Sequence, residues 1–155
     1  MILESDAFGL DMRRAFVIDD DEHIHEFVEL TLAEQGFKTE RFKIAKDALA
    51  ALGHDHPAII FLDVALLYSD AIDVLIGLGE QKYDGVVHLM SGGRQQLLEA
   101  VQRLGVRHGV KLAPPMGKPI GRETIIRAII GMDSLIAAPR PQRAVGKTAS
   151  PAAKA

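Results

Sequence analysis

Two hydrophobic patterns alternate along the chain. Short, mostly apolar runs predict strands at 14–18, 58–63, 86–90 and 110–113, and the less apolar run at 37–42 predicts a further strand. After each run, apolar residues recur at helical spacing and predict helices at 22–35, 45–52, 71–78, 97–108 and from about 125. Five strand and helix pairs predict an α/β fold: a five-stranded parallel sheet with helices on both faces.

Acidic residues follow two of the predicted strands. The apolar run that begins at Arg14 leads into Asp19 and Asp20, and the run that begins at Ala58 leads into Asp63. In open α/β sheets ligands bind at the carboxyl ends of the strands. Crowded carboxylates repel one another unless a cation lies among them, and oxygen ligands suit Mg²⁺. The alternative for 19–22 is that these acidic residues only cap the helix that follows.

Composition narrows the class of protein. The chain has 155 residues, 48% of them hydrophobic, which suits one globular domain. A net charge of −3 argues against a nucleic-acid binder, and no apolar run approaches the roughly 20 residues that span a bilayer. The absence of cysteine excludes disulfides and thiol catalysis. We therefore expect a soluble cytoplasmic protein that binds neither nucleic acid nor membrane.

The periodic part of the chain has clear limits. Residues 1–12 read as an N-terminal extension and 13–132 as the folded domain. Residues 133–155 are rich in alanine and proline, carry basic residues and lack apolar periodicity, so we expect a flexible basic tail.

Four strand ends together supply a chemically coherent set of side chains. Asp19 and Asp20, Asp63, Ser91 and Lys118 each follow a predicted strand. A carboxylate can accept a phosphoryl group to form an acyl phosphate, while a hydroxyl and a lysine can bind phosphoryl oxygens. Taken singly, Ser91 also fits a turn before two glycines, and Lys118 fits a solvated surface charge.

The ordered motifs that carry these residues resemble the receiver domain of two-component response regulators. They are Val17-Ile18-Asp19-Asp20-Asp21, Phe61-Leu62-Asp63, Leu89-Met90-Ser91-Gly92 and Gly117-Lys118-Pro119-Ile120, and the likeness covers about 14–131. The resemblance implies the flavodoxin-like (βα)5 receiver fold with sheet order 2-1-3-4-5. It also implies a cis peptide bond between Lys118 and Pro119.

The resemblance further implies a role for each residue of the set. Asp63 is the expected phosphoacceptor. Asp20, Asp63 and the backbone carbonyl of Ala65 are expected to hold Mg²⁺, with Asp19 assisting through water. Ser91 matches the switch hydroxyl, and Lys118 matches the lysine that contacts the phosphoryl group.

By this resemblance we expect a bacterial, single-domain response regulator rather than an enzyme with a separate substrate. A histidine kinase or phosphotransfer protein would phosphorylate it, and it would then bind a downstream protein. Two alternatives remain open: a receiver-like scaffold that binds partners without phosphorylation, and a Mg²⁺-dependent aspartyl phosphatase. Such phosphatases usually carry an acidic residue two positions after the nucleophile, where this chain has Ala65.

The chain departs from the family pattern at several positions. The usual proline and glycine after the phosphoacceptor are Leu67 and Ala71, and the usual aromatic three residues before the lysine is Pro115. We therefore expect any conformational response to run through Ser91, the 92–96 loop and the fourth helix. The two small residues that flank the phosphoryl group, Ala65 and Gly93, cannot hold an attacking water and predict a long-lived acyl phosphate.

Histidines and isoleucines supply the remaining candidates. His23 and His25, and His54 and His56, lie two residues apart and do not match the spacing of helical zinc ligands, so surface histidines are the better interpretation. The isoleucines of the last helix predict core, and any exposed part of that stripe would form a homodimer or partner surface. They are Ile125, Ile126, Ile129 and Ile130.

Overall fold

The computed structural model describes residues 13–53, 56–66 and 70–142. Its elements are β1 (Arg13–Ile18), α2 (Glu22–Glu34), β2 (Phe37–Phe42), α3 (Ala45–Leu52), β3 (Ile59–Asp63), α4 (Ala71–Glu80), β4 (Val86–Ser91), α5 (Gln95–Arg107), β5 (Lys111–Leu112), β6 (Met116–Gly117) and α6 (Arg122–Ala137). The strands are parallel in the order β2-β1-β3-β4-β5, and β6 also pairs with β4. The α/β class and the sheet order predicted from the sequence are both confirmed.

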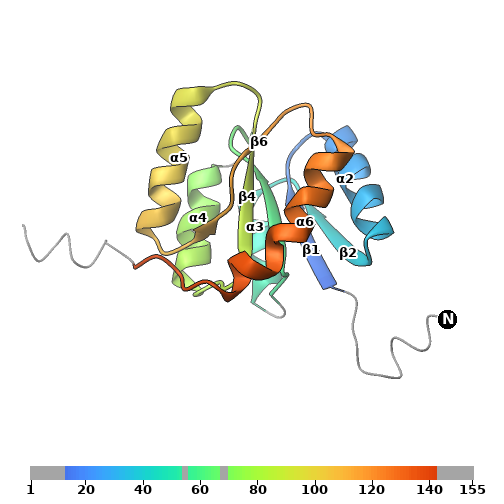
Figure 1. The fold of residues 1–155 in the computed structure, drawn as a ribbon. Coiled ribbons are helices and arrows are strands. Elements are labelled where there is room, and N and C mark those ends of the chain that lie inside the picture. Colours follow the sequence, from blue (N-terminus) through green and yellow to red (C-terminus); the bar gives the residue numbers. More distant parts are fainter. Residues whose placement is uncertain (1–12, 54–55, 67–69, 143–155) are drawn as a thin grey trace, which may run out of the picture.

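Helices cover both faces of this sheet (Figure 1). One apolar cluster joins the sheet to α3, α4 and α5, and a second joins it to α2 and α6. The central strand β3 serves both clusters, because Ile60 and Leu62 lie in the first while Ile59 and Phe61 lie in the second. Successive side chains of a strand point to opposite faces, which is why this strand is apolar from Ile59 to Leu62, up to the carboxylate at its end.

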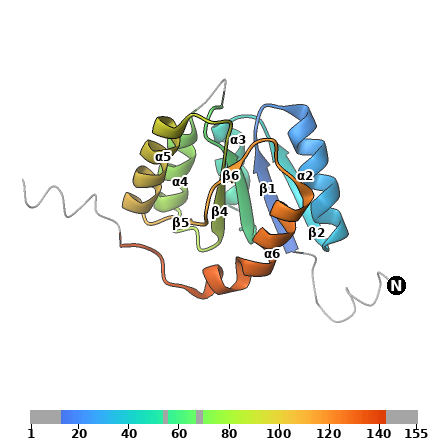
Figure 2. The same ribbon diagram turned by 45° about the horizontal axis from the view of Figure 1, so that its top comes forward.

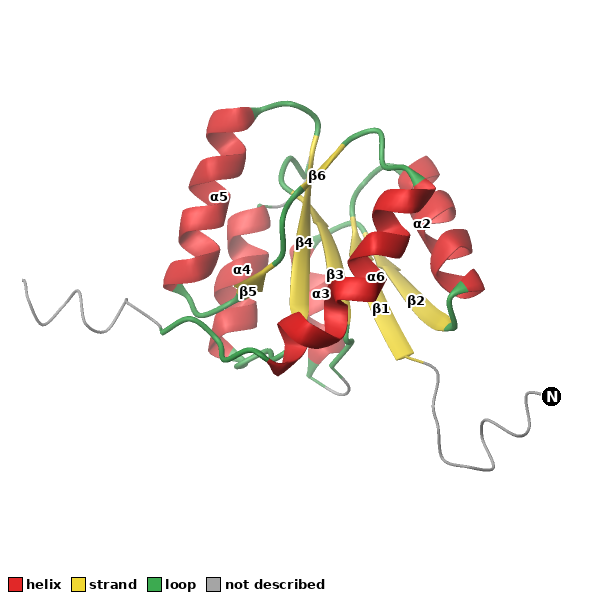
Figure 3. Cartoon of the chain, in the orientation of Figure 1, coloured by secondary structure: helices red, strands yellow, loops and turns green. Residues whose placement is uncertain are grey.

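The last predicted strand is interrupted. In place of one strand over 110–113, the chain forms β5 and then β6, both paired with β4 (Figure 3). Pro114 and Pro115 lie between them, and proline has no N–H to donate to a strand ladder. The strand therefore stops at Leu112 and resumes at Met116, which carries the chain to Lys118.

The last helix is longer than its sequence pattern indicated. It continues to Ala137, beyond the expected domain boundary at 132. Met132 is fully buried and Ile136 packs on the apolar cluster beneath α6. The ammonium of Lys111 on β5 also donates to the carbonyl of Ile136 and so satisfies a group at the helix end. The predicted extension at 1–12 and the tail from 143 lie outside the described residues.

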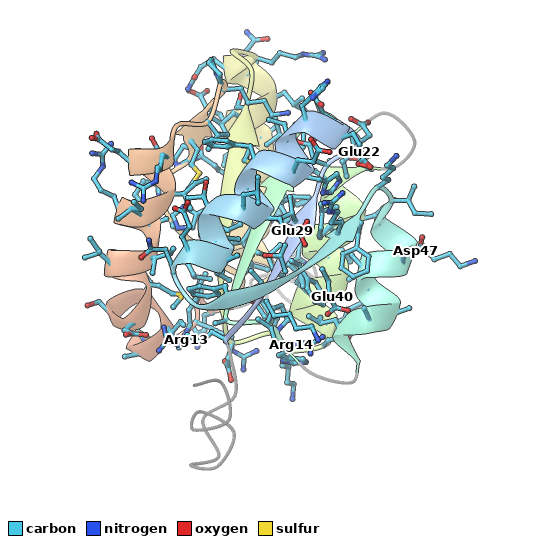
Figure 4. All side chains as sticks on the ribbon, turned by 90° about the vertical axis from the view of Figure 1, so that its right-hand side faces the viewer. Arg13, Arg14, Glu22, Glu29, Glu40 and Asp47 are labelled. Atoms are coloured by element: carbon cyan, nitrogen blue, oxygen red, sulfur yellow. The ribbon has the colours of Figure 1, made fainter. Side chains whose placement is uncertain are left out.

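Charged side chains line the edge of the sheet formed by β2 (Figure 4). Arg14 of β1 pairs with Glu40 of β2, and Arg41 of β2 pairs with Glu29 of α2. Arg41 also lies 3.6 Å from Glu22. Charged residues on an edge strand discourage pairing with another sheet.

The isoleucine stripe of α6 belongs only partly to the core. Ile125 is fully buried, whereas Ile130 is 75% exposed. The expectation that all four isoleucines are core is therefore wrong for Ile130, and a homodimer through this helix stays a prediction. Within the described residues, no helix is long and apolar enough to cross a bilayer.

Candidate functional site

The predicted site residues meet at the carboxyl ends of the strands, at the top of Figure 1 and toward the viewer in Figure 2. β1 and β3 are parallel neighbours in which Ile18 pairs with Leu62, so Asp19 and Asp63 leave the sheet side by side. Ser91 ends β4, and its carbonyl accepts the N–H of Lys118 at 2.8 Å. Backbone pairing thus brings together residues that are far apart in the sequence.

Three carboxylates form the acidic part of the site. Asp19, Asp20 and Asp63 each present an oxygen within 4.8 Å of the others. Asp19 is fully buried and Asp63 is 5% exposed. The N–H of Asp21 donates to Asp19 Oδ1 at 2.8 Å, and the N–H of Ala65 donates to Asp63 Oδ1 at 3.0 Å. These bonds fix the rotamers of both carboxylates.

Lys118 supplies the opposing charge. Its Nζ lies 3.0 Å from Asp19 Oδ2 and 3.3 Å from Asp63 Oδ2. Burial by itself lowers the pKa of Lys118, but the hydrogen bond to Asp19 and the charges of both aspartates outweigh it, so the pKa is raised. The ammonium is therefore charged at neutral pH. The interpretation of Lys118 as a solvated surface charge is wrong.

Burial also governs Asp19. Removal from water raises the pKa of its carboxyl, and the nearby charge of Asp63 adds to this effect. The N–H of Asp21 and the ammonium of Lys118 counteract part of the rise. A buried carboxylate beside two others is a place where an additional cation would be stabilising.

Ser91 occupies the expected strand end and is 6% exposed. Its Oγ accepts the N–H of Gly93 at 3.4 Å, so the serine also shapes the turn after β4. The turn interpretation of Ser91 is therefore confirmed, and its role as the switch hydroxyl stays a prediction.

Comparison with solved structures gives the family of this fold. The receiver domain of NtrX from Brucella abortus matches at a TM-score of 0.67 and 25% identity, covering 80% of this chain and 99% of that domain. The receiver domain of the Francisella response regulator 1452 matches at a TM-score of 0.63 and 25% identity, covering 80% and 96%. The chain contains a response-regulator receiver domain.

This receiver corresponds to only part of some relatives. A longer NtrX structure from Brucella abortus matches at a TM-score of 0.70 and 24% identity over 81% of this chain, which spans 27% of the length of that protein. No protein-family model matches the sequence, and no curated protein matches it.

The donor set of the receiver fits a magnesium ion. Three carboxylates offer the hard oxygen ligands that Mg²⁺ prefers, and Asp20 is only partly buried, which leaves the site open to water. The carbonyl of Ala65 as a further ligand stays a prediction. The peptide bond between Lys118 and Pro119 is cis, as expected.

One expectation about the histidines is wrong. His25 was interpreted as a surface residue, yet it is fully buried, and its Nε2 lies 2.5 Å from the carbonyl oxygen of Asp19. His23 and His56 are exposed as expected, whereas His54 and Leu67 lie outside the described residues. The sequence did contain a signal: His25 stands one residue after Ile24 and three before Val28, on the side of the helix that enters the core.

Proposed function

We propose that this receiver accepts a phosphoryl group on Asp63 from a histidine kinase or phosphotransfer protein and signals through phosphorylation-dependent binding of a downstream protein. The observation that carries the proposal is the convergence of Asp63 with two further carboxylates and one ammonium at the strand ends. Asp63 is ordered by the N–H of Ala65 and remains reachable at 5% exposure.

In the proposed step a carboxylate oxygen of Asp63 attacks the phosphorus of a phosphohistidine. The new P–O bond forms as the P–N bond breaks, and the imidazole leaves with the electron pair. Lys118, already 3.3 Å from Asp63, would pair with a phosphoryl oxygen, and the hydroxyl of Ser91 would bind another. When bound by Asp19, Asp20 and Asp63, Mg²⁺ would neutralise charge on the transferring group.

We further propose a phosphoacceptor rather than an enzyme with turnover. Hydrolysis of a separate phosphoester requires a general acid for the leaving group. Ala65, which lies beside the carboxylate and donates its N–H to it, has only a methyl side chain. No proton can be delivered from this position.

The test is incubation with acetyl phosphate and Mg²⁺, followed by intact-protein mass spectrometry. Wild-type protein should gain the mass of one phosphoryl group, only when Mg²⁺ is present. Asp63→Asn should gain none, because the amide is not a nucleophile of this kind. Asp73→Asn, which alters an exposed aspartate of α4, is the matched control and should behave as wild type. An equal mass gain in Asp63→Asn would refute the assignment of the phosphoacceptor.

A further inference from the structure

His25, the buried histidine of α2, makes a contact that has no part in the proposed phosphoryl transfer. His25 Nε2 lies 2.5 Å from the carbonyl oxygen of Asp19, and both residues are fully buried. A carbonyl can only accept, so Nε2 carries a proton and donates it to this bond. Within the part of the chain that the structure describes, Nδ1 has no hydrogen-bond partner. The ring is therefore held by this one bond and by packing.

This bond acts on the segment that carries the acidic residues. The carbonyl of Asp19 and the N–H of Asp20 belong to one planar peptide unit, so fixing the carbonyl fixes the plane from which Asp20 continues. The other groups of Asp19 are also held. Its N–H donates to the carbonyl of Phe42 at 3.0 Å, and its carboxylate accepts a hydrogen bond from the N–H of Asp21. The His25 bond completes this set of anchors.

The helix that carries His25 is held in place at its N-terminus and along its buried side. α2 begins at its N-cap Asp21, whose side chain accepts the N–H of His23 at 2.9 Å. Val28 and Leu32 on the same helix are fully buried in the core. Because His25 lies in the first turns, its ring reaches back to the end of β1 while the helix itself stays anchored.

We infer that His25 is a positioning residue of the magnesium site: its Nε2–H holds the Asp19 carbonyl and thereby sets where Asp20 presents its carboxylate. This inference rests on the proposed function, since it concerns the ion used in phosphoryl transfer. Groups that orient metal ligands typically contribute 10- to 100-fold in metal affinity. His25 acts through the backbone, so we expect roughly tenfold, the lower end of that range.

A pair of amide substitutions separates this role from simple packing. The Nε2 of glutamine lies the same number of bonds from Cα as the Nε2 of histidine, whereas the nitrogen of asparagine is one bond closer and cannot reach Asp19. His25→Gln should therefore keep Mg²⁺ affinity within about twofold of wild type, and His25→Asn should weaken it roughly tenfold. The measurement is isothermal titration calorimetry with MgCl₂, at a temperature well below the thermal unfolding midpoint of each variant.

The matched control is Thr31→Val on the same helix. Thr31 is 4% exposed, lies six residues after His25 on α2, and its hydroxyl donates to the carbonyl of Phe27 at 2.9 Å. This variant also loses a side-chain hydrogen bond of α2, but we expect unchanged Mg²⁺ affinity. Equal weakening in Thr31→Val and His25→Asn would overturn the inference, because it would show a general effect of a destabilised helix. Wild-type affinity in His25→Asn would overturn it as well.

A metal-free readout keeps the inference separate from the proposed function. In ¹⁵N amide spectra without Mg²⁺, His25→Asn should shift the Asp20 and Asp21 signals, because the peptide plane that precedes Asp20 is no longer held. His25→Gln should leave these signals near their wild-type positions. If wild-type protein bound no Mg²⁺, the proposed ion-dependent function would fail. The spectra alone would then decide whether His25 positions the loop, and unchanged signals in His25→Asn would overturn that claim.

Discussion

His88 gives this receiver a dependence on pH that follows from its surroundings. The residue lies on β4 at 5% exposure, its ring stacks on Phe61 with centroids 5.7 Å apart, and Nδ1 lies 3.3 Å from the carbonyl of Pro114. Burial lowers the pKa of His88 from 6.5 to about 4, and the Pro114 carbonyl opposes only part of that shift. His88 also lines a cavity of about 330 Å³ beneath α6.

The sign and size of the effect come from proton linkage. As pH falls from 6.5 toward 4, the unfolded chain protonates this histidine while the folded protein keeps it neutral. The unfolded state then binds more protons, so the free energy of unfolding falls with falling pH across this window. The loss is about 1.4 kcal/mol per pH unit and on the order of 3 kcal/mol over the whole window.

Urea unfolding at pH 7 and pH 5, followed by far-ultraviolet circular dichroism, measures this loss. Wild-type protein should lose roughly 2 kcal/mol more between the two pH values than His88→Phe, which replaces the titrating ring with one of similar shape. His56→Phe controls for removal of an exposed histidine. The reasoning is refuted if wild type and His88→Phe lose the same free energy of unfolding.

Three further predictions follow from other positions. Gly131→Ala should raise the free energy of unfolding by about 0.5 to 1 kcal/mol in the same urea assay, because an added Cβ meets open space in a helix interior; a lower value would contradict this. Tyr83→Phe should cost about 1 to 3 kcal/mol, since its buried hydroxyl donates to the carbonyl of Pro57 at 2.7 Å, and an unchanged urea midpoint would argue against that bond. The acyl phosphate should be long-lived, because Ala65 and Gly93 offer no group to orient water; a lifetime of seconds, measured by loss of the phosphorylated mass after removal of the phosphodonor, is incompatible with this.

The fold was largely predictable because its strands are specified locally. The run over 58–62, just before Asp63, is apolar at every position, and a strand covered on both faces requires that composition. Once five such strands alternate with helices, a parallel sheet follows, and the residues just past each strand end must gather at one edge. Asp19, Asp63 and Ser91 were therefore placed correctly without any knowledge of side-chain contacts.

The C-terminal part was less predictable because long-range contacts shape it. Nothing in the local pattern at Pro114 and Pro115 says that pairing with β4 resumes at Met116. Where α6 extends to Ala137, Ile136 packs on the core and its carbonyl accepts a hydrogen bond from Lys111, which is distant in sequence. A boundary inferred from loss of periodicity cannot anticipate a helix end that a buried lysine satisfies.

The role of His25 shows a different limit. A functional residue at a strand end or in a loop motif can be recognised in the sequence, because its residue type and its place after the strand both indicate its chemistry. His25 acts on a backbone carbonyl, and any donor of the right length on the inner side of α2 could do the same. Composition and spacing therefore place the histidine on the inner side of a helix but do not indicate which group it bonds. The inferred role of His25 follows from its hydrogen bond to the Asp19 carbonyl in the folded chain. Comparing His25→Gln with His25→Asn tests whether that hydrogen bond matters.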